Sequence, residues 1–190
     1  MKNMIKKFSR ELEVVAALAV IMVVIQPIYF SPSNLLDILD QSVINGLLAI
    51  GMTLVIITAG IDLTVGSTLA IVIVSVGNFL VMGLNPFAAV LAGAAIGFGL
   101  GLVNGILVAK MKLQPFVATL GMMSVYRGVA YLITGGWPVL NIPQNFRDIM
   151  DGDVIGTLSS SMILFLVVTV IAYILLKHTK FGTYLYSIGS

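Results

Sequence analysis

The sequence has no cysteine and only one histidine among its 190 residues. The missing cysteines exclude disulfides, thiolate zinc sites and cysteine nucleophiles, and a single histidine excludes a multi-histidine metal site. Charged residues are scarce at 9%, whereas soluble domains carry about 25%. A chain that is 59% hydrophobic cannot present the polar surface of a soluble enzyme. No nucleophile–base pair is visible, so we expect a membrane protein that is not an enzyme and has no cofactor.

Long apolar runs occupy most of the chain. A membrane helix needs about 20 mainly apolar residues, and six runs meet this length. The first follows basic residues, as in a signal peptide, but it is longer than a signal h-region and lacks a small-residue cleavage site. We therefore expect a single all-α, polytopic membrane domain over 1–190 with about six transmembrane helices. The predicted spans are about 12–30, 43–60, 63–84, 86–109, 116–134 and 154–176.

Basic residues are distributed unevenly between the two sides of these spans. With the N-terminus in the cytoplasm, every lysine and arginine except Arg127 and Arg147 falls on the cytoplasmic side. Cytoplasmic loops of membrane proteins carry an excess of Lys and Arg. We therefore expect both ends of the chain in the cytoplasm and external loops at about 31–42 and 135–153.

The second and third runs are separated by a polar interruption, Ala59–Ser67, that contains Asp62. A carboxylate at the bilayer centre costs at least about 2.5–3.5 kcal/mol, so Asp62 needs an interface, a wet cavity or a partner. One interpretation makes Asp62 an N-cap that accepts amide hydrogen bonds at the start of the third helix. The other makes the interruption a broken helix that lines a solute path. The two are compatible, and either a re-entrant segment or a surface turn fits the residues.

Small residues recur every fourth position along the fourth run, at Gly93, Gly97, Gly101 and Gly105. On a helix they form one smooth face, which lets a neighbouring helix approach closely in lipid. We assign these glycines to helix packing, with pore lining as the alternative. Arg127 lies well inside the fifth run, where it must reach outward, pair with a carboxylate or line a polar cavity.

The chain also lacks a phosphate-binding GxxxxGK[ST] loop and a row of intramembrane acidic residues. If transport here is active, the energy source is therefore expected in another subunit.

Four stretches, in this order, resemble the ribose-type permease subunits of bacterial ATP-binding-cassette importers. The most specific is GMTLVIITAGIDLTVGS at 51–67. The others are NGILVAK at 104–110, FVATLGMM at 116–123 followed by Arg127-Gly128, and TKFGTYLYSIG at 179–189. The resemblance implies a permease subunit that forms the translocation path for a ribose-like monosaccharide in the bacterial inner membrane.

The resemblance also implies partners: a second permease subunit, identical or different, cytoplasmic ATPase subunits that hydrolyse ATP, and an external sugar-binding protein. Members of this family are longer, so we expect this chain to be an N-terminal, C-terminally incomplete portion of such a permease. The residues near the region that couples to the ATPase are expected to be Lys180, Phe181, Gly182, Tyr186 and Gly189.

A path for a neutral, hydroxyl-rich solute calls for hydroxyls, amides and a few polar aromatics. Two other functions fit the composition: an ion-driven secondary transporter or channel, and a truncated remnant that inserts without transporting. Sparse intramembrane charge disfavours the first. The candidate path residues are Asn45, Asp62, Thr64, Ser67, Asn104, Tyr126 and Arg127.

Overall fold

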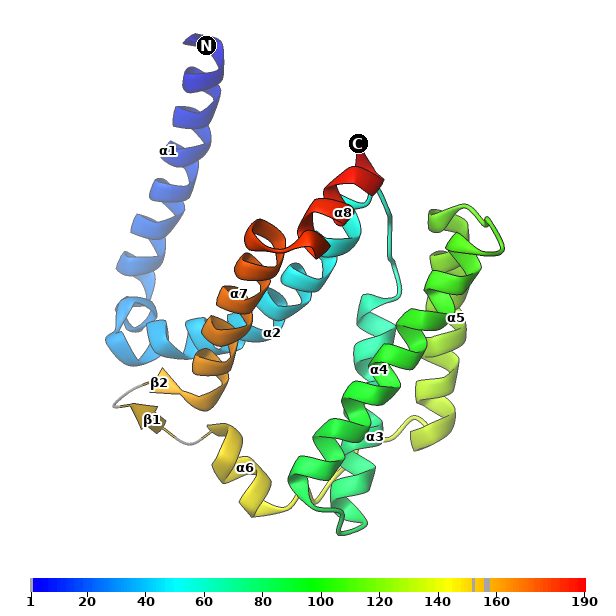
Figure 1. The fold of residues 1–190 in the computed structure, drawn as a ribbon. Helices are drawn as coiled ribbons and strands as arrows, with labels where there is room; N and C mark the ends of the chain where they lie inside the picture. The colour runs from blue at the N-terminus through cyan, green and yellow to red at the C-terminus, as the bar shows by residue number, and fades with distance from the viewer. Residues whose placement is uncertain (1, 152, 156–157) are drawn as a thin grey trace.

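The computed structural model describes residues 2–151, 153–155 and 158–190 (Figure 1). Within these ranges the regular structure is helical, apart from a short antiparallel hairpin of β1 (Asp153–Ile155) and β2 (Leu158–Ser159). The expected all-α polytopic class is confirmed. The helices are α1 (Lys2–Ile25), the 3-10 turn η1 (Pro27–Phe30), α2 (Pro32–Ile57), α3 (Val65–Val81), α4 (Pro86–Ala109), α5 (Pro115–Thr134), α6 (Gln144–Asp151), α7 (Ser160–His178) and α8 (Lys180–Gly189).

Among the described residues, four helices are long and apolar enough to cross a membrane: α2, α4, α5 and α7. Two further apolar helices are shorter, namely α3 and the Glu13–Ile25 part of α1. At about 1.5 Å per residue, the 17 residues of α3 extend roughly 26 Å, less than a hydrocarbon core of about 30 Å. The non-helical chain before α3 therefore runs beside the part of α4 that extends beyond the length of α3.

Local sequence signals explain where the helices begin. Pro32, Pro86 and Pro115 each occupy the first helical position, where a missing N–H costs nothing. Ser31 accepts the Asn34 amide before α2, and Asn85 accepts the Phe87 amide before α4. Gly135 ends α5 in the left-handed region, with a φ of 62°.

Three helix ends differ from the predicted limits of the spans. The predicted external loop at 31–42 is the first part of α2, because Ser31 and Pro32 start a helix before the apolar run begins. The span predicted from 154 begins at Ser160, after the hairpin. The span predicted to reach Phe30 ends as α-helix at Ile25, followed by η1.

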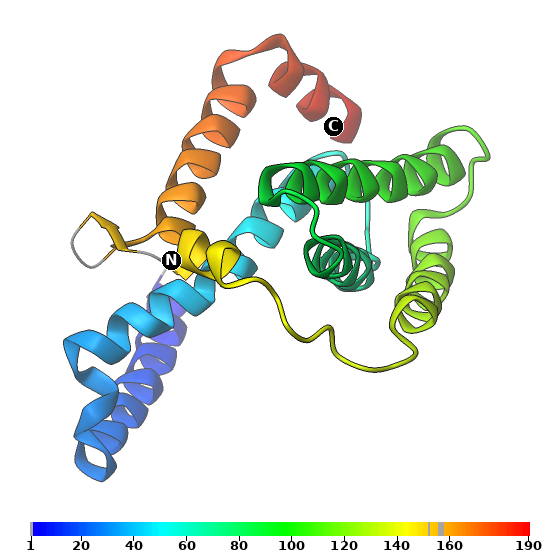
Figure 2. The same cartoon turned by 90° about the horizontal axis from the view of Figure 1, so that it is seen from below.

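Helices α3, α4 and α5 form a bundle beside the α2–α7 pair (Figures 1 and 2). The centre of the bundle is a cluster of Ile71, Tyr126 and Ala130, packed against partly buried apolar side chains of α3, α4 and α5. Helix α1 stands apart from the bundle in all views, and its described apolar side chains are largely exposed. Such a surface suits contact with lipid tails.

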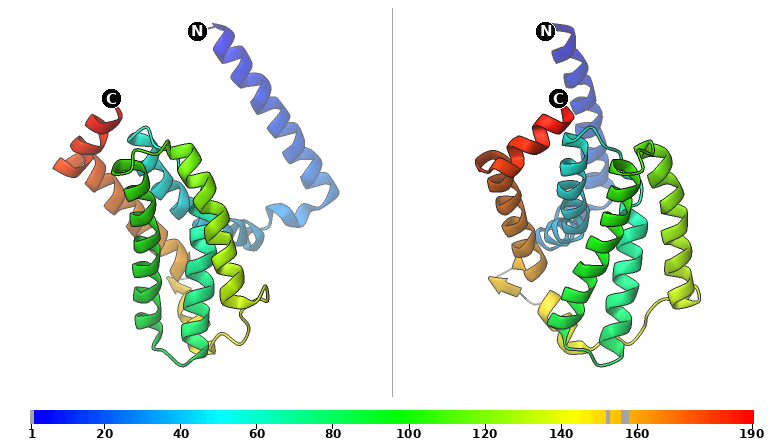
Figure 3. Two further views of the ribbon diagram at one scale, coloured as in Figure 1. Left: turned by 90° about the vertical axis from the view of Figure 1, so that its right-hand side faces the viewer. Right: turned by 45° about the vertical axis from the view of Figure 1, so that its right-hand side comes forward.

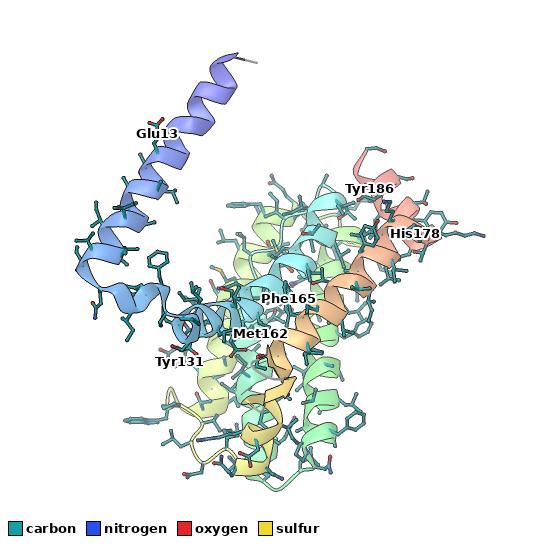
Figure 4. All side chains as sticks on the ribbon, turned by 90° about the vertical axis from the view of Figure 1, so that its left-hand side faces the viewer. Glu13, Tyr131, Met162, Phe165, His178 and Tyr186 are labelled. Atoms are coloured by element: carbon teal, nitrogen blue, oxygen red, sulfur yellow. The ribbon has the colours of Figure 1, made fainter. Side chains whose placement is uncertain are left out.

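Helices α2 and α7 cross at Gly46 and Phe165. A Cβ at Gly46 would lie 2.6 Å from Cε2 of Phe165, so the glycine leaves room for the ring. Phe165 and the buried Met162 lie along this crossing in Figure 4. At the β2 end of α7, the hydroxyls of Ser159 and Ser161 donate to Oδ1 of Asp40 on α2.

Both chain ends and the α4–α5 turn lie at one end of the molecule, at the top of Figure 1 and in both views of Figure 3. Lys110 and Lys112 belong to that turn, and Lys177 and Lys180 lie where α7 meets α8. The α3–α4 turn and α6, which carries Arg147, lie at the opposite end. The basic residues therefore concentrate at the end where the two termini lie.

The glycine row of α4 contacts α3 over half of its length. The place of a Cβ at Gly93 is filled by Cγ2 of Val76, and Val72 Cγ1 lies 3.3 Å away. A Cβ at Gly97 would make an ordinary 3.5 Å contact with Val72. Gly93 and Gly97 thus lie at the α3–α4 interface.

This packing predicts opposite effects for two alanine substitutions on one helix. Gly93→Ala should lower the free energy of unfolding by about 1–3 kcal/mol, because the methyl group overlaps Val76. Gly99→Ala should leave it unchanged or raise it by up to about 1 kcal/mol, because the space is open and alanine favours helix. Thermal unfolding in one detergent measures both, and equal shifts would contradict the assigned interface.

Candidate functional site

Helix α2 ends in a Schellman motif at the start of the interruption. The Gly60 amide donates to the Val55 carbonyl at 3.1 Å, and the Ala59 amide donates to the Ile56 carbonyl at 2.9 Å. Ala59 takes a φ of 56°, a left-handed conformation that glycine adopts more readily. Beyond it the chain runs without regular structure to Val65, so the helix is broken across 58–64.

Asp62 organises the restart of the helix. Its Oδ1 accepts the Thr64 amide at 2.7 Å and the Thr64 hydroxyl at 2.6 Å. Thr64 occupies the N-cap position of α3, and the hydroxyl of the buried Ser67 donates to its carbonyl at 2.9 Å. A carboxylate at a helix N-terminus is also favoured by the helix dipole. The expected break in the helix is present. The expectation that Asp62 is the N-cap residue is wrong, because Thr64 holds that position, but the Asp62 carboxylate does accept an amide at the helix start.

A chain of hydrogen bonds connects the break to the neighbouring helices. Asn104 Nδ2 on α4 donates to Thr64 Oγ1 at 2.8 Å. The Tyr126 hydroxyl on α5 lies 2.8 Å from the Leu100 carbonyl and 3.2 Å from Asn104 Oδ1, and it can donate to either. Thr64, Asn104 and Tyr126 are 1%, 6% and 3% exposed. Buried polar groups are stable only when paired, so these bonds hold the break against α4 and α5.

Thr119 is a member of this cluster that the sequence analysis did not single out. Its hydroxyl donates to the Pro115 carbonyl at 2.8 Å and lies 3.4 Å from the Ile61 carbonyl. It is 2% exposed. The sequence did place a hydroxyl about one turn into the fifth span, within the family-like stretch 116–123. Its partners are backbone carbonyls, however, and their positions are known only once the chain has folded.

Two cavities border Asp62. One of about 350 Å³ lies between α2, the start of α3 and α4, and Thr64, Thr68 and Gly97 contribute to its lining. The other, of about 230 Å³, lies between the end of α2, α4 and α5, and its lining includes Asn104 and Thr119. Asp62, Val55 and Gly101 line both cavities.

The second half of the glycine row borders these cavities. Apart from the adjoining residues and the backbone of α4 itself, no described atom lies within 4 Å of a Cβ placed on Gly101 or Gly105. Gly101 lines both cavities, and Gly105 lines the smaller one. The glycine row therefore packs against α3 at Gly93 and borders a cavity at Gly101.

Asn45 and Arg127 lie outside the cluster. Asn45 is exposed on α2, next to the glycine that faces α7. Arg127 is exposed on α5 and lines a separate hollow of about 330 Å³ with Tyr131 and Thr134. Within the described part of the chain neither forms a hydrogen bond or ion pair. The structure therefore brings together Asp62, Thr64, Ser67, Asn104 and Tyr126, and it leaves these two apart.

The residues expected near the ATPase coupling region all lie on α8. At Gly182 a Cβ would meet the Leu176 carbonyl of α7, and at Gly189 it would meet the Ile57 carbonyl at the end of α2. Lys180, Phe181 and Tyr186 are exposed, and Figure 4 labels His178 at the end of α7 and Tyr186 on α8. A larger hollow of about 700 Å³ opens between α7 and α8, and it shares no lining residue with the two cavities at Asp62. Helix α8 thus touches α2 directly before the break.

The helices and the interrupted span define a polytopic membrane protein. The chain belongs to the family described as branched-chain amino acid transport system / permease component, whose model matches residues 34–190. The ribose import permease protein RbsC of Bacillus subtilis (strain 168) is 40% identical over 174 residues, covering 90% of this chain and 54% of that protein. The resemblance to ribose-type permeases is thereby confirmed.

Other relatives are named for different substrates. The galactofuranose transporter permease protein YtfT of Escherichia coli (strain K12) is 38% identical over 154 residues, covering 81% of this chain and 45% of that protein. The autoinducer 2 import system permease protein LsrC of Klebsiella pneumoniae (strain ATCC 700721 / MGH 78578) is 36% identical over 192 residues, covering 100% and 55%. The chain spans about half the length of the curated relatives it matches. No solved structure matches it.

The hydrogen-bond chain predicts that Thr64 is more important for stability than its neighbour Thr68. Thr64→Val keeps the shape but leaves Asp62 and Asn104 without a shared partner, which should lower the free energy of unfolding by about 1–3 kcal/mol. Thr68→Val loses one long 3.5 Å contact and should cost less than about 0.5 kcal/mol. Unfolding by denaturant in mixed micelles compares the two variants. Equal losses would show that the chain does not hold the break.

Proposed function

We propose that this chain forms part of the membrane permease subunit of an ATP-binding-cassette importer, and that it lines the translocation path of a ribose-like monosaccharide. The observation that supports this most strongly is the break at 58–64, which places one carboxylate and several hydrogen-bonding groups between two cavities. Relatives named as ribose, galactofuranose and autoinducer 2 permeases support a small polar solute. The permease performs no chemistry, and ATP hydrolysis belongs to a partner chain.

The path in this proposal runs along the two cavities beside Asp62. The larger cavity is about 350 Å³, within the size range of small-molecule sites. Its walls are mostly apolar, with hydroxyls at Thr64 and Thr68 and the carboxylate of Asp62. Few polar groups on apolar walls suit a path that a solute must also leave, since tight binding would hold it there. Asn45 and Arg127 line neither cavity, so a role for them in the path would be at a different place from Asp62.

The proposed orientation places both chain ends in the cytoplasm of a bacterial cell. Its support is the concentration of lysines at the end that carries both termini and the α4–α5 turn (Figures 1 and 3). The proposed partners are a second permease subunit, cytoplasmic ATPase subunits and an external sugar-binding protein. In this arrangement α6 and the hairpin face the binding protein, and α8 faces the ATPase.

The direct test is uptake of radiolabelled ribose by cells that depend on the natural polypeptide. We expect uptake that is lost when the partner ATPase carries a substituted phosphate-binding lysine and that persists in ATP-loaded vesicles after an ionophore collapses ion gradients. Galactofuranose serves as the second solute. Uptake that depends on the ion gradient and not on the ATPase would show a secondary transporter instead. If neither sugar is taken up, the sugar assignment is contradicted.

The contact between α8 and the end of α2 predicts a transport defect. Gly189→Ala pushes a methyl group into the Ile57 carbonyl and should lower ribose uptake at least about tenfold, because α8 can no longer rest on the residues that precede the break. Gly128→Ala, where no described atom lies within 4 Å of the added carbon, is the matched control. Membrane abundance is measured by immunoblot for both. Normal uptake by Gly189→Ala at normal abundance would refute a role for this contact.

A further inference from the structure

The charges around the two cavities are unbalanced. Asp62 lines both, and among the described residues that line either cavity it is the one charged side chain. Lys110 follows α4 two residues after the lining residue Val108, and it is exposed at the α4–α5 turn. Arg127 lines a different hollow. A solute in either cavity therefore meets a carboxylate without a facing cation.

The helix ends at the break do not cancel this charge. The end of α2 contributes about −0.5 of a unit charge, and the start of α3 contributes about +0.5. Val55 and Thr58 from the first helix end and Thr64 and Val65 from the second line the cavities, so the two partial charges oppose each other. The carboxylate of Asp62 remains as the net charge of the site.

The hydrogen bonds of Asp62 fix one of its oxygens and leave the other for a solute. Both donors from Thr64 go to Oδ1. Within the described part of the chain Oδ2 receives no hydrogen bond. Thr64 is in turn held by Asn104, so the carboxylate cannot rotate away without breaking the buried chain.

We propose that Asp62 acts as a charge filter: the cavities admit neutral solutes with hydroxyl donors and cationic solutes, and they exclude anionic ones such as sugar acids and sugar phosphates. The filter makes Asp62 a specificity-determining residue. Its meaning for transported solutes rests on the proposed function, whereas the charge preference of the cavities is measurable without transport.

The test uses charged thiol reagents on an introduced cysteine, because residues 1–190 contain no cysteine. The natural polypeptide without the introduced cysteine gives the background reaction. Gly101→Cys places a thiol in the open space that both cavities share. The natural polypeptide in lipid nanodiscs, which expose both faces, is treated with methanethiosulfonates that carry a trimethylammonium, a hydroxyl or a sulfonate group. In each case the thiolate attacks the reagent sulfur, forms a mixed disulfide and releases methanesulfinate. Rates are divided by those of free 2-mercaptoethanol.

We expect the normalised rate of the cationic reagent at Gly101→Cys to exceed that of the anionic reagent at least about tenfold, since unit charges attract strongly across a partly wet cavity. The added substitution Asp62→Asn should bring the ratio close to one, Asp62→Glu should retain it, and the exposed Asp37→Asn should not change it. At Met111→Cys, between Lys110 and Lys112, the anionic reagent should react faster.

Two results would overturn the filter: a ratio near one at Gly101→Cys in the protein with Asp62, or failure of all three reagents to react there. Both come from the protein that keeps Asp62, so misfolding of an Asp62 variant does not obscure them. In a folded Asp62→Asn variant, an unchanged ratio would also overturn the proposal, because another group would then carry the preference. Loss of sugar uptake would refute the proposed function while leaving a measured charge preference intact.

Discussion

A chain inside a bilayer has no water for its backbone groups, so it can leave the helix only where protein groups or a wet cavity replace the lost hydrogen bonds. The break at 58–64 meets this constraint with particular residues. The Schellman motif satisfies the end of α2, Asp62 receives the amide of Thr64, and Thr119 lies beside the Ile61 carbonyl. Asn104 lies about one and a half turns inside the end of α4, which places these groups within the depth of the neighbouring spans.

The surroundings of the break follow from that constraint. Helix α4 supplies both the amide that holds Thr64 and the bare glycine face at Gly101 that leaves space next to it. Close packing at Gly93 and open space at Gly101 lie on the same helix, so α4 packs against α3 at one end and borders the cavities at the other. Because α8 rests on the Ile57 carbonyl, its movement would act on the first residues of the break.

Much of this arrangement could be predicted from residue types alone. A carboxylate with glycines and hydroxyls between two apolar runs indicated a break, and Asn104 and Tyr126 were polar positions that needed partners. The early start of α2 at Pro32 escaped prediction because hydropathy marks the apolar core of a helix, whereas capping decides its end. The separation of Asn45 from the cluster depends on the rotation of α2, which its contact with α7 sets. The partner of Thr119 is a backbone carbonyl, which carries no sequence signal.

The central claim is that residues 61–63 lie outside any helix, and that Ile61 and Asp62 line cavities. In the described part of the chain their amides donate to no protein acceptor, whereas amides inside α4 are bonded within the helix. Hydrogen–deuterium exchange of the natural polypeptide in nanodiscs, resolved to single amides, tests this most directly. The account predicts that amides 61–63 exchange at least about a hundredfold faster than those at the centre of α4, because each tenfold in exchange corresponds to about 1.4 kcal/mol of protection. Equal protection across 55–70 would mean a continuous helix and would contradict the account.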